Sequence, residues 1–353
     1  MKRGEVVGGY RVITEPTNNG GGNCVWAFGE RDKEQVFIKC FLEPKRPRPD
    51  STASEKSKRL RLQACEEFEK RHRTIMKMLK PDASGGGNLV LAKELFYEGS
   101  TYYKITERIE TSSLATPADL DSRQKRVLLR TLVLSLKQLH DIGVVHGDLK
   151  LDNVLVQKRS KRAFYTTKLI DFDDSYVSGH PPDAESIGGD VRFGAPEWQR
   201  YVRQDGSVRP DFLTTASDIF ALGLMAHYYL TGALPGFPDG YDSAADAVNA
   251  EKPLRLDGRL ASETRELIKA MTARSPGSRP GVDVLLERLR DERIFVLNKK
   301  SEFTPSPPGS TVPREPKPSR VSTNMNGKRP VAPSVTEPVK SAGKRTSRVR
   351  INR

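Results

Sequence analysis

The residues best suited to chemistry lie in two short segments near the middle of the chain. The first begins at His146 and reads H-x-D-x-K-x-x-N. The second, an apolar run from Leu169, ends in D-F-D at residues 171–173. A lone H-x-D would be a surface turn, because an isolated aspartate more often caps or turns a chain than catalyses. The complete pattern, flanked by short apolar strands predicted at 144–145 and 154–156, makes coincidence a poor explanation.

Together the two segments hold the parts that phosphoryl transfer requires. That reaction leaves little covalent work to the protein, which must orient a nucleophile, hold Mg²⁺ on the phosphates and offset negative charge. Asp148 could orient or deprotonate a hydroxyl group, and Lys150 could face the transferring phosphoryl group. Asn153 and Asp171 would supply the hard oxygen ligands that Mg²⁺ prefers. These four are the candidate catalytic residues, and the last two are the candidate metal ligands.

Hydrophobic patterning predicts the elements that must position these residues. Short apolar runs punctuated by glycine predict strands joined as hairpins, at 6–13, 24–28, 35–42, 89–97 and 101–109. Helical spacing predicts a long amphipathic helix over about 57–80, with an apolar set of Ala64, Phe68, Ile75, Met76 and Leu79. A basic, proline-rich insertion at 43–58 precedes it, and a buried helix is predicted at 119–140.

Composition separates the folded part of the chain from a basic tail. The formal net charge is +14, and residues 299–353 hold thirteen Lys or Arg against three Glu, which is +10 of it. The tail is rich in Pro, Ser and Thr with few large apolar residues, so we expect it to be disordered. Several hydroxyls there could be autophosphorylation or docking sites, with solvated disorder as the alternative: Thr304, Ser319, Ser322 and Ser347. Nucleic acid is not favoured as a partner, because no aromatic residue follows Phe303 to stack on bases.

Cysteine usage and hydropathy predict a cytoplasmic protein with no membrane anchor. Cys24, Cys40 and Cys65 have no C-x-x-C spacing and are odd in number, which argues against a disulfide framework or a cysteine-rich zinc site. The first residues lack an apolar signal-peptide core, and no apolar run reaches the roughly 18 residues of a membrane span. We read Cys24 as a buried or tolerated thiol rather than a redox sensor.

The order of elements and motifs resembles the eukaryotic-type protein kinases over residues 6 to about 296. The two central segments match their catalytic and metal-binding loops. Three further matches are Val36-Phe37-Ile38-Lys39 to V-A-I-K, Ala195-Pro196-Glu197 to A-P-E, and residues 218–223 to D-x-F-A-L-G. The resemblance implies an α+β, two-lobed fold. Its parts are a small antiparallel β-sheet N-lobe with one main helix (1–109), a larger, mostly helical C-lobe (110–297) and a disordered basic tail (298–353).

The resemblance also implies an ATP site between the lobes. A glycine-rich turn would cover the phosphates, with the cofactor-binding residues Gly20, Gly21, Gly22 and Val25. In G-x-G-x-x-G-x-V only Gly20 keeps its place, so a plain flexible hairpin tip is the alternative. The base would lie against the strand that ends at Ile109, with Thr106 as gatekeeper and the backbone of Glu107 and Ile109 as hydrogen-bonding partners.

In the same resemblance Lys39 contacts the α- and β-phosphates of ATP. A glutamate on the predicted helix would hold it, and Glu69 is the candidate because it shares a face with Cys65 and His72. Glu66 and Glu67 are rivals, and a lysine on an alternating strand would otherwise be solvated. The resemblance further implies a structural ion pair between Glu197 and Arg279.

Two departures from the family pattern bear on regulation. Gly147 replaces the arginine of H-R-D, through which activation-segment phosphates lock many kinases, so we expect less dependence on such a switch. Asp173 replaces the glycine of D-F-G, which removes a residue free to take positive φ.

The same H-G-D sequence raises an alternative from another class, the small-molecule phosphotransferases of the aminoglycoside and choline kinase type. Lys150 opposes it, because serine/threonine kinases place a lysine two residues after the catalytic aspartate. A pseudokinase scaffold is the third reading. The favoured hypothesis is a serine/threonine protein kinase of the bacterial, actinobacterial type, dependent on ATP and on Mg²⁺ or Mn²⁺, that phosphorylates protein substrates and itself.

Overall fold

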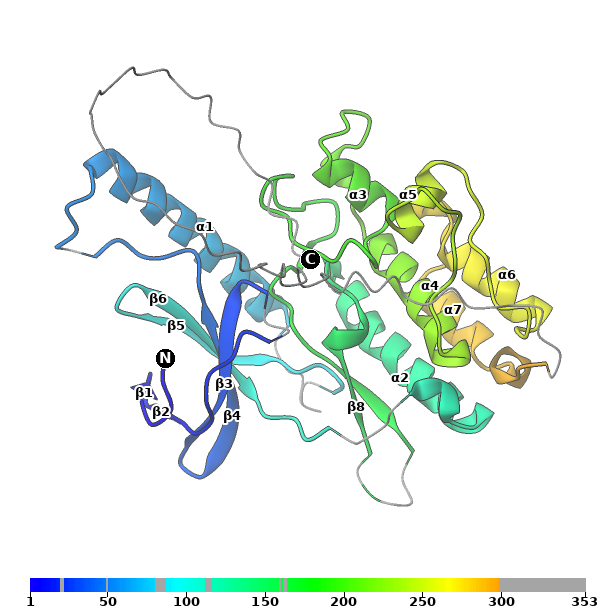
Figure 1. Ribbon diagram of the computed structural model, residues 1–353, viewed down its shortest axis with the longest axis horizontal. Coiled ribbons are helices and arrows are strands. Elements are labelled where there is room, and N and C mark those ends of the chain that lie inside the picture. Colours follow the sequence, from blue (N-terminus) through cyan, green and yellow to red (C-terminus); the bar gives the residue numbers. More distant parts are fainter. Residues whose placement is uncertain are drawn as a thin grey trace, which may run out of the picture.

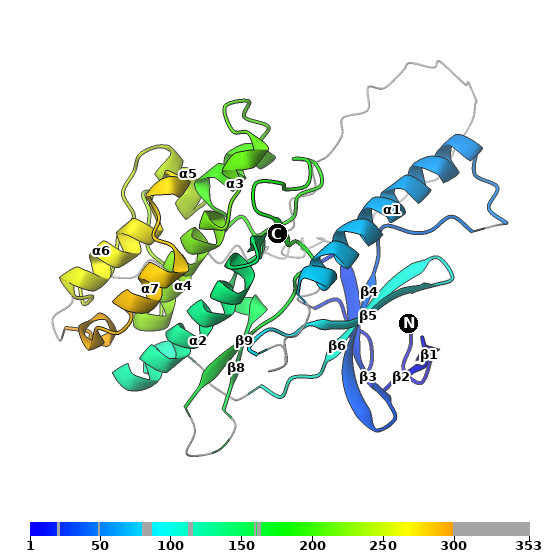
Figure 2. The same ribbon diagram turned by 180° about the vertical axis from the view of Figure 1, so that it is seen from behind.

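The computed structural model describes residues 1–19, 22–48, 50–79, 87–111, 116–158, 160 and 164–298. Gly20, Gly21 and the tail from residue 299 lie outside this range, so the predictions made for them are not addressed. Two lobes are seen side by side in Figures 1 and 2, one built on a sheet and the other on helices.

The first lobe is a six-stranded antiparallel sheet with the order β1-β2-β3-β4-β6-β5. Its strands are β1 (Val6–Val7), β2 (Tyr10–Val12), β3 (Cys24–Arg31), β4 (Glu34–Phe41), β5 (Ala92–Glu98) and β6 (Thr101–Glu107). The single strand predicted at 6–13 is instead two strands. Gly8 and Gly9 lie between them with φ of 55° and 84°, a conformation that suits glycine and reverses the chain as a tight hairpin.

Helix α1 (Glu55–Met78) packs against this sheet. The Ser54 side chain accepts a hydrogen bond from the backbone N of Ser57, so the helix begins within the predicted insertion. Its buried residues are Cys65, Phe68, His72 and Ile75, whereas Ala64 is exposed, contrary to prediction. In both views the N-terminal end of α1 extends away from the sheet, while its C-terminal end reaches the junction of the lobes (Figures 1 and 2).

The second lobe is mainly helical. Its helices are α2 (Ser122–His140), α3 (Pro196–Val202), α4 (Ala216–Thr231), α5 (Ala244–Asn249), α6 (Ser262–Met271) and α7 (Val282–Arg288). The lobe also contains short 3₁₀ turns, at Pro117–Asp119, Leu151–Asn153, Pro210–Phe212, Pro276–Ser278 and Glu292–Phe295. Two small antiparallel pairs complete the lobe, β7 (Val144–Val145) with β10 (Tyr176–Val177) and β8 (Val154–Gln157) with β9 (Thr166–Leu169).

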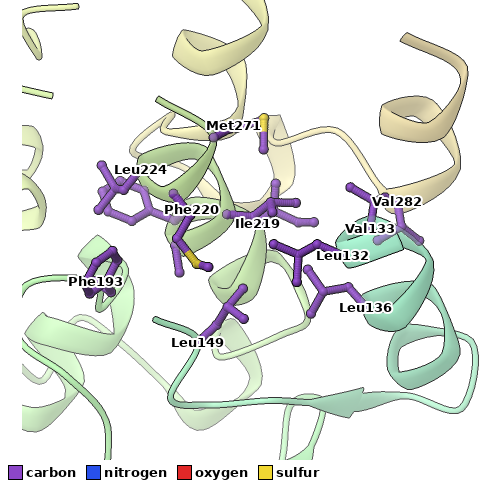
Figure 3. Close-up of a cluster of buried hydrophobic side chains, with 14 of the residues drawn as sticks. Leu132, Val133, Leu136, Leu149, Phe193, Ile219, Phe220, Leu224, Met271 and Val282 are labelled. Atoms are coloured by element: carbon purple, nitrogen blue, oxygen red, sulfur yellow. The ribbon is translucent and has the colours of Figure 1, made fainter. Parts of the chain in front are cut away.

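A continuous apolar core of the helical lobe packs against the motif segments. Leu132 and Leu136 of α2 face Ile219 and Phe220 of α4, and Leu149 from the central motif packs into the same cluster (Figure 3). Each of these side chains is at most 3% exposed. The motif segments are therefore anchored on close-packed helices, which limits how far they can shift.

The lobes also share backbone hydrogen bonds. The N–H of Val90 donates to the carbonyl of Leu169 at 2.9 Å, and the N–H of Leu169 donates to the carbonyl of Asn88 at 2.7 Å. This contact places the metal-loop segment, which follows Leu169, beside the sheet lobe. Within the described ranges, no helix is long and apolar enough to cross a membrane.

Candidate active site

One buried carboxylate of α4 accepts hydrogen bonds from the backbone of the central motif. Asp218 Oδ2 accepts a hydrogen bond from the backbone N of His146 at 2.8 Å, and Oδ1 accepts one from the N of Gly147 at 3.2 Å. The imidazole of His146 contacts the carbonyl of Ile170 through Nε2 at 3.0 Å. Burial lowers the pKa of His146 despite the nearby charge of Asp218. Asp218 thus joins the catalytic loop to α4, and the imidazole of His146 joins it to the segment that precedes Asp171.

Asp148, Lys150 and Asn153 meet as predicted from their spacing. Lys150 Nζ donates to Asp148 Oδ2 at 2.6 Å, and Asn153 Nδ2 donates to the same oxygen at 3.0 Å. Asp148 Oδ1 is buried and has no hydrogen-bond partner within the described part of the chain. Burial raises the pKa of Asp148, and the Lys150 charge opposes that shift. One oxygen is thus fixed by neighbours while the other remains available to accept a proton or a hydrogen bond.

The donor set of Asn153 and Asp171 fits a magnesium ion. Asn153 commits its amide nitrogen to the carbonyl and carboxylate of Asp148, which leaves its Oδ1 as the atom for a cation. Asp171 has a φ of 64°, so this aspartate itself adopts the left-handed conformation. Both are oxygen donors of the type that Mg²⁺ takes. Asp173 does not have a positive φ, so the glycine of D-F-G is not required here for its conformational freedom.

The predicted pairing of Glu69 with Lys39 is wrong. Glu69 Oε1 instead accepts hydrogen bonds from Tyr102 Oη and Arg46 Nη2, each at 2.6 Å. The alternatives Glu66 and Glu67 are exposed. The position along α1 explains the difference, because Glu69 and His72 lie on the same face of the helix and it is His72, three positions nearer the C-terminal end, that reaches Asp173.

Lys39 obtains its carboxylates from the metal loop. Its Nζ lies 2.8 Å from both oxygens of Asp171 and 2.6 Å from Asp173 Oδ2. Burial opposes the ammonium charge, but Asp173 and Asp171 outweigh it and hold the pKa of Lys39 well above its ordinary value. Asp173 also lies 2.5 Å from Lys104 Nζ and 3.4 Å from His72 Nε2, both through Oδ1. The sequence analysis did not identify Lys104 as a site residue and did not predict that Asp173 contacts Lys39.

Val25 does not share the sheet face of Lys39. It pairs with Cys40, whereas Trp26 pairs with Lys39, and successive side chains of a strand point to opposite faces. Val25 therefore packs on the apolar cluster around Ile38 rather than toward the site, which corrects its assignment as a nucleotide contact. The apolar ring on the Lys39 face at this point is that of Trp26.

Three aromatic rings gather on the Lys39 face. Trp26 stacks on Phe37 with ring centroids 5.3 Å apart, and Phe28 meets both rings edge-on. Thr106 pairs with Phe37 and therefore lies on this face as well. The alternation of β3 and β4 could have indicated the cluster, because Trp26 and Phe28 are two residues apart on β3, Phe37 is two residues from Lys39 on β4, and the two strands form a hairpin.

The remaining residues assigned to the nucleotide lie at the C-terminal end of β6 and in the turn before β3. Glu107 is the last residue of β6, and Ile109 follows the strand, which is shorter than predicted. Gly22 has a φ of 56°, and Trp26 Nε1 donates to the carbonyl of Asn19 at 2.9 Å, which ties the turn to β3. A cavity of about 210 Å³ lies behind Phe172, between α1 and the sheet, and includes Lys104 and His72 in its lining.

Residues 174–194, which correspond to the activation segment that the A-P-E sequence closes in kinases, add a further carboxylate. Asp190 Oδ2 lies 3.9 Å from Lys150 Nζ, and its Oδ1 accepts a hydrogen bond from the backbone N of Arg192 at 2.8 Å. Burial opposes the Lys150 charge, but Asp148 and Asp190 raise its pKa. Lys150 is therefore cationic at neutral pH and lies between the carboxylates of Asp148 and Asp190.

The fold and this arrangement of residues are those of the two-lobed kinase class. The family model for the protein kinase domain matches residues 34–289, more than half of the chain. The chain therefore belongs to the protein kinase family, which confirms the resemblance to the eukaryotic-like serine/threonine branch. The actinobacterial type stays a prediction.

Curated relatives are serine/threonine kinases at low identity. The chain is 25% identical to serine/threonine-protein kinase RAD53 of Saccharomyces cerevisiae, in a match that covers 54% of this chain and 24% of that protein. It is 23% identical to a probable KIN1 homologue of Encephalitozoon cuniculi over 80% of its length and 46% of the relative. It is 32% identical to the kinase/endoribonuclease IRE1b of Arabidopsis thaliana over 50% of its length and 20% of the relative. The chain thus spans between a fifth and a half of these proteins.

Proposed function

We propose that the chain is an ATP- and Mg²⁺-dependent serine/threonine protein kinase that modifies protein hydroxyls and also itself. The observation that carries the proposal is the buried Asp148 Oδ1, which lacks a partner while Lys150 and Asn153 fix the other carboxylate oxygen. Family membership and the named serine/threonine kinases among the relatives support the reaction class.

In this mechanism the chain orients the reactants and disperses charge. When bound, ATP supplies the γ-phosphoryl group and Mg²⁺ neutralises charge on its phosphates. Asn153 Oδ1 and Asp171 would hold the metal, and Lys39 would contact the α- and β-phosphates. Asp148 Oδ1 accepts a hydrogen bond from the substrate hydroxyl, whose oxygen forms the new P–O bond as the bond to ADP breaks, and takes up the released proton. Lys150 stabilises the negative charge on the transferred group.

Three finer statements belong to the same proposal. Mn²⁺ would substitute for Mg²⁺, because the donors are carboxylate and amide oxygens. A cytoplasmic location is supported by Cys24, Cys40 and Cys65, which are buried thiols not joined in disulfides. A docking role for the basic tail concerns residues outside the described range.

The test is transfer from labelled ATP with Mg²⁺ by the purified chain, offered a generic basic protein. We expect phosphate on serine or threonine of the substrate and of the kinase, located by mass spectrometry. Transfer only to an added aminoglycoside or small alcohol would instead support the small-molecule class. Nucleotide binding without any transfer would support a pseudokinase scaffold.

A further inference from the structure

The carboxylate that holds Lys39 comes from the position where the family motif has a glycine. Asp173 lies among side chains of three separate elements, with Lys39 on β4, Lys104 on β6 and His72 on α1. Its Oδ2 faces Lys39 at 2.6 Å, and its Oδ1 faces Lys104 at 2.5 Å. Its side chain is 13% exposed, so these contacts are shielded from solvent.

The register of the sheet explains why a carboxylate is needed there. Lys39 and Lys104 are directly paired across β4 and β6, so their side chains share one face. Like charges in that position repel, and Lys104 is only 7% exposed. A buried ammonium is costly unless an anion accompanies it. Asp173 lies between the two cations and offsets both.

Asp171 is not suited to hold Lys39 alone. Lys39 contacts both of its oxygens, at 2.8 Å each. The same oxygens are the atoms assigned to the metal, and a carboxylate oxygen shared with Mg²⁺ attracts an ammonium less strongly. The contact between Lys39 and Asp173 does not conflict with metal binding in this way, because Asp173 is not one of the residues assigned to the metal. Its other oxygen is held by Lys104.

We propose that Asp173 is the positioning residue of Lys39, and that its carboxylate, held by Lys104 and covered by His72, replaces a glutamate from α1. The inference rests on the proposed function, since it concerns the lysine that contacts the nucleotide phosphates. It assigns α1 a different part from the one predicted. Glu69 ties α1 to Arg46 and Tyr102, while His72 closes the cluster around Asp173.

The test is a double-mutant cycle on kcat/KM for ATP, with labelled ATP, Mg²⁺ and a basic protein substrate. Asp173→Asn keeps the shape and removes the charge, and we expect a loss of about 10- to 100-fold. In a Lys39→Met background the same substitution should cost less than about two-fold, because the group it positions is absent. Glu69→Gln is the matched control and should stay within about two-fold of wild type.

Two results would overturn the inference. One is Asp173→Asn activity within about two-fold of wild type; the other is an equal loss from Asp173→Asn in the wild-type and Lys39→Met backgrounds, which indicates a general structural effect. Asp173→Asn could lower the melting temperature because Lys104 loses its anion. In that case the cycle is repeated with Lys104→Met in every variant, which removes the unpaired cation, and the same criteria apply. A wild-type chain that transfers no phosphate would contradict the proposed function instead.

Discussion

Arg279 and Glu197 form a buried bidentate ion pair between residues 82 positions apart. Nη1 and Nη2 of Arg279 each donate to one oxygen of Glu197, both at 2.7 Å, and the side chains are 0% and 4% exposed. Ser217 Oγ donates to the same carboxylate at 2.8 Å. The pair predicted from the A-P-E segment is thus confirmed, and it ties the end of the activation segment to the helical lobe.

Removing one partner of this pair should destabilise the protein strongly. Arg279→Ala leaves the Glu197 carboxylate buried without its cation, which typically costs about 3 to 5 kcal/mol. The control is Arg274→Ala, because Arg274 pairs with Glu251 where the side chains are 48% and 77% exposed. Such a surface pair contributes at most about 1 kcal/mol. Urea unfolding followed by circular dichroism measures both, and equal effects would contradict the structural role.

Gly147 should tolerate no side chain. Its φ is 82°, and a Cβ built there would lie 2.3 Å from the carbonyl oxygen of Asp174. Gly147→Ala should therefore lower both the melting temperature and kcat. Gly143→Ala is the matched control, since Gly143 has a φ of 69° with nothing within 4 Å. That control should lose only the roughly 1 to 2 kcal/mol of a left-handed residue. If Gly147→Ala and Gly143→Ala lose the same stability, the left-handed backbone alone explains why position 147 is glycine, and the close approach of the Asp174 carbonyl does not contribute.

Glu69 should matter for stability rather than for turnover, and its effect should depend on pH. Burial opposes its charge, but hydrogen bonds from Tyr102 and Arg46 lower its pKa below the ordinary value. A depressed pKa contributes stability above the unfolded-state pKa of about 4.3, and that stability is lost as the pH falls through the folded-state pKa. Glu69→Gln should therefore lower the melting temperature at pH 7, by the equivalent of about 1 to 3 kcal/mol.

The difference between wild type and Glu69→Gln should shrink steadily as the pH is lowered below about 4. Differential scanning fluorimetry over pH 7 to 3 measures it, with the exposed Glu55→Gln as a control for loss of a helix charge. A difference that stays constant over this range would show that the carboxylate charge is not what stabilises this contact. A difference that grows as the pH falls would give the pKa shift the opposite sign.

The meeting of the proposed catalytic residues was predictable because it depends on short sequence separations. Asp148, Lys150 and Asn153 lie within six residues of one turn, so their spacing alone brings them together. Asp171 follows β9, which pairs with β8, the strand after the motif, and the pairing returns Asp171 to the same place. In both cases local geometry determines the distance between the side chains.

The pairing of Lys39 was not predictable in the same way. Glu69 and His72 share one face of α1, and both approach the sheet lobe. The position of the helix along its own axis decides which of them reaches the site, and amphipathic patterning specifies the buried face but not that axial position. A shift of one residue likewise moves Val25 to the opposite face of β3. Asp173 and Lys104 come together only through tertiary packing. The sequence shows that both are charged and that Lys104 occupies an alternating position of a predicted strand, but not that the two side chains meet.

Asp148→Asn should separate nucleotide binding from phosphoryl transfer. The amide keeps the shape of the carboxylate but cannot take up the proton of the substrate hydroxyl, so kcat should fall by about 10²- to 10⁴-fold. ATP affinity should change little, because the phosphate and metal contacts are assigned to Lys39, Asn153 and Asp171. Asp152→Asn is the matched control, since Asp152 is exposed in the same loop. Steady-state rates and calorimetric titration of ATP measure the two quantities, and near wild-type turnover in Asp148→Asn would remove Asp148 from the mechanism.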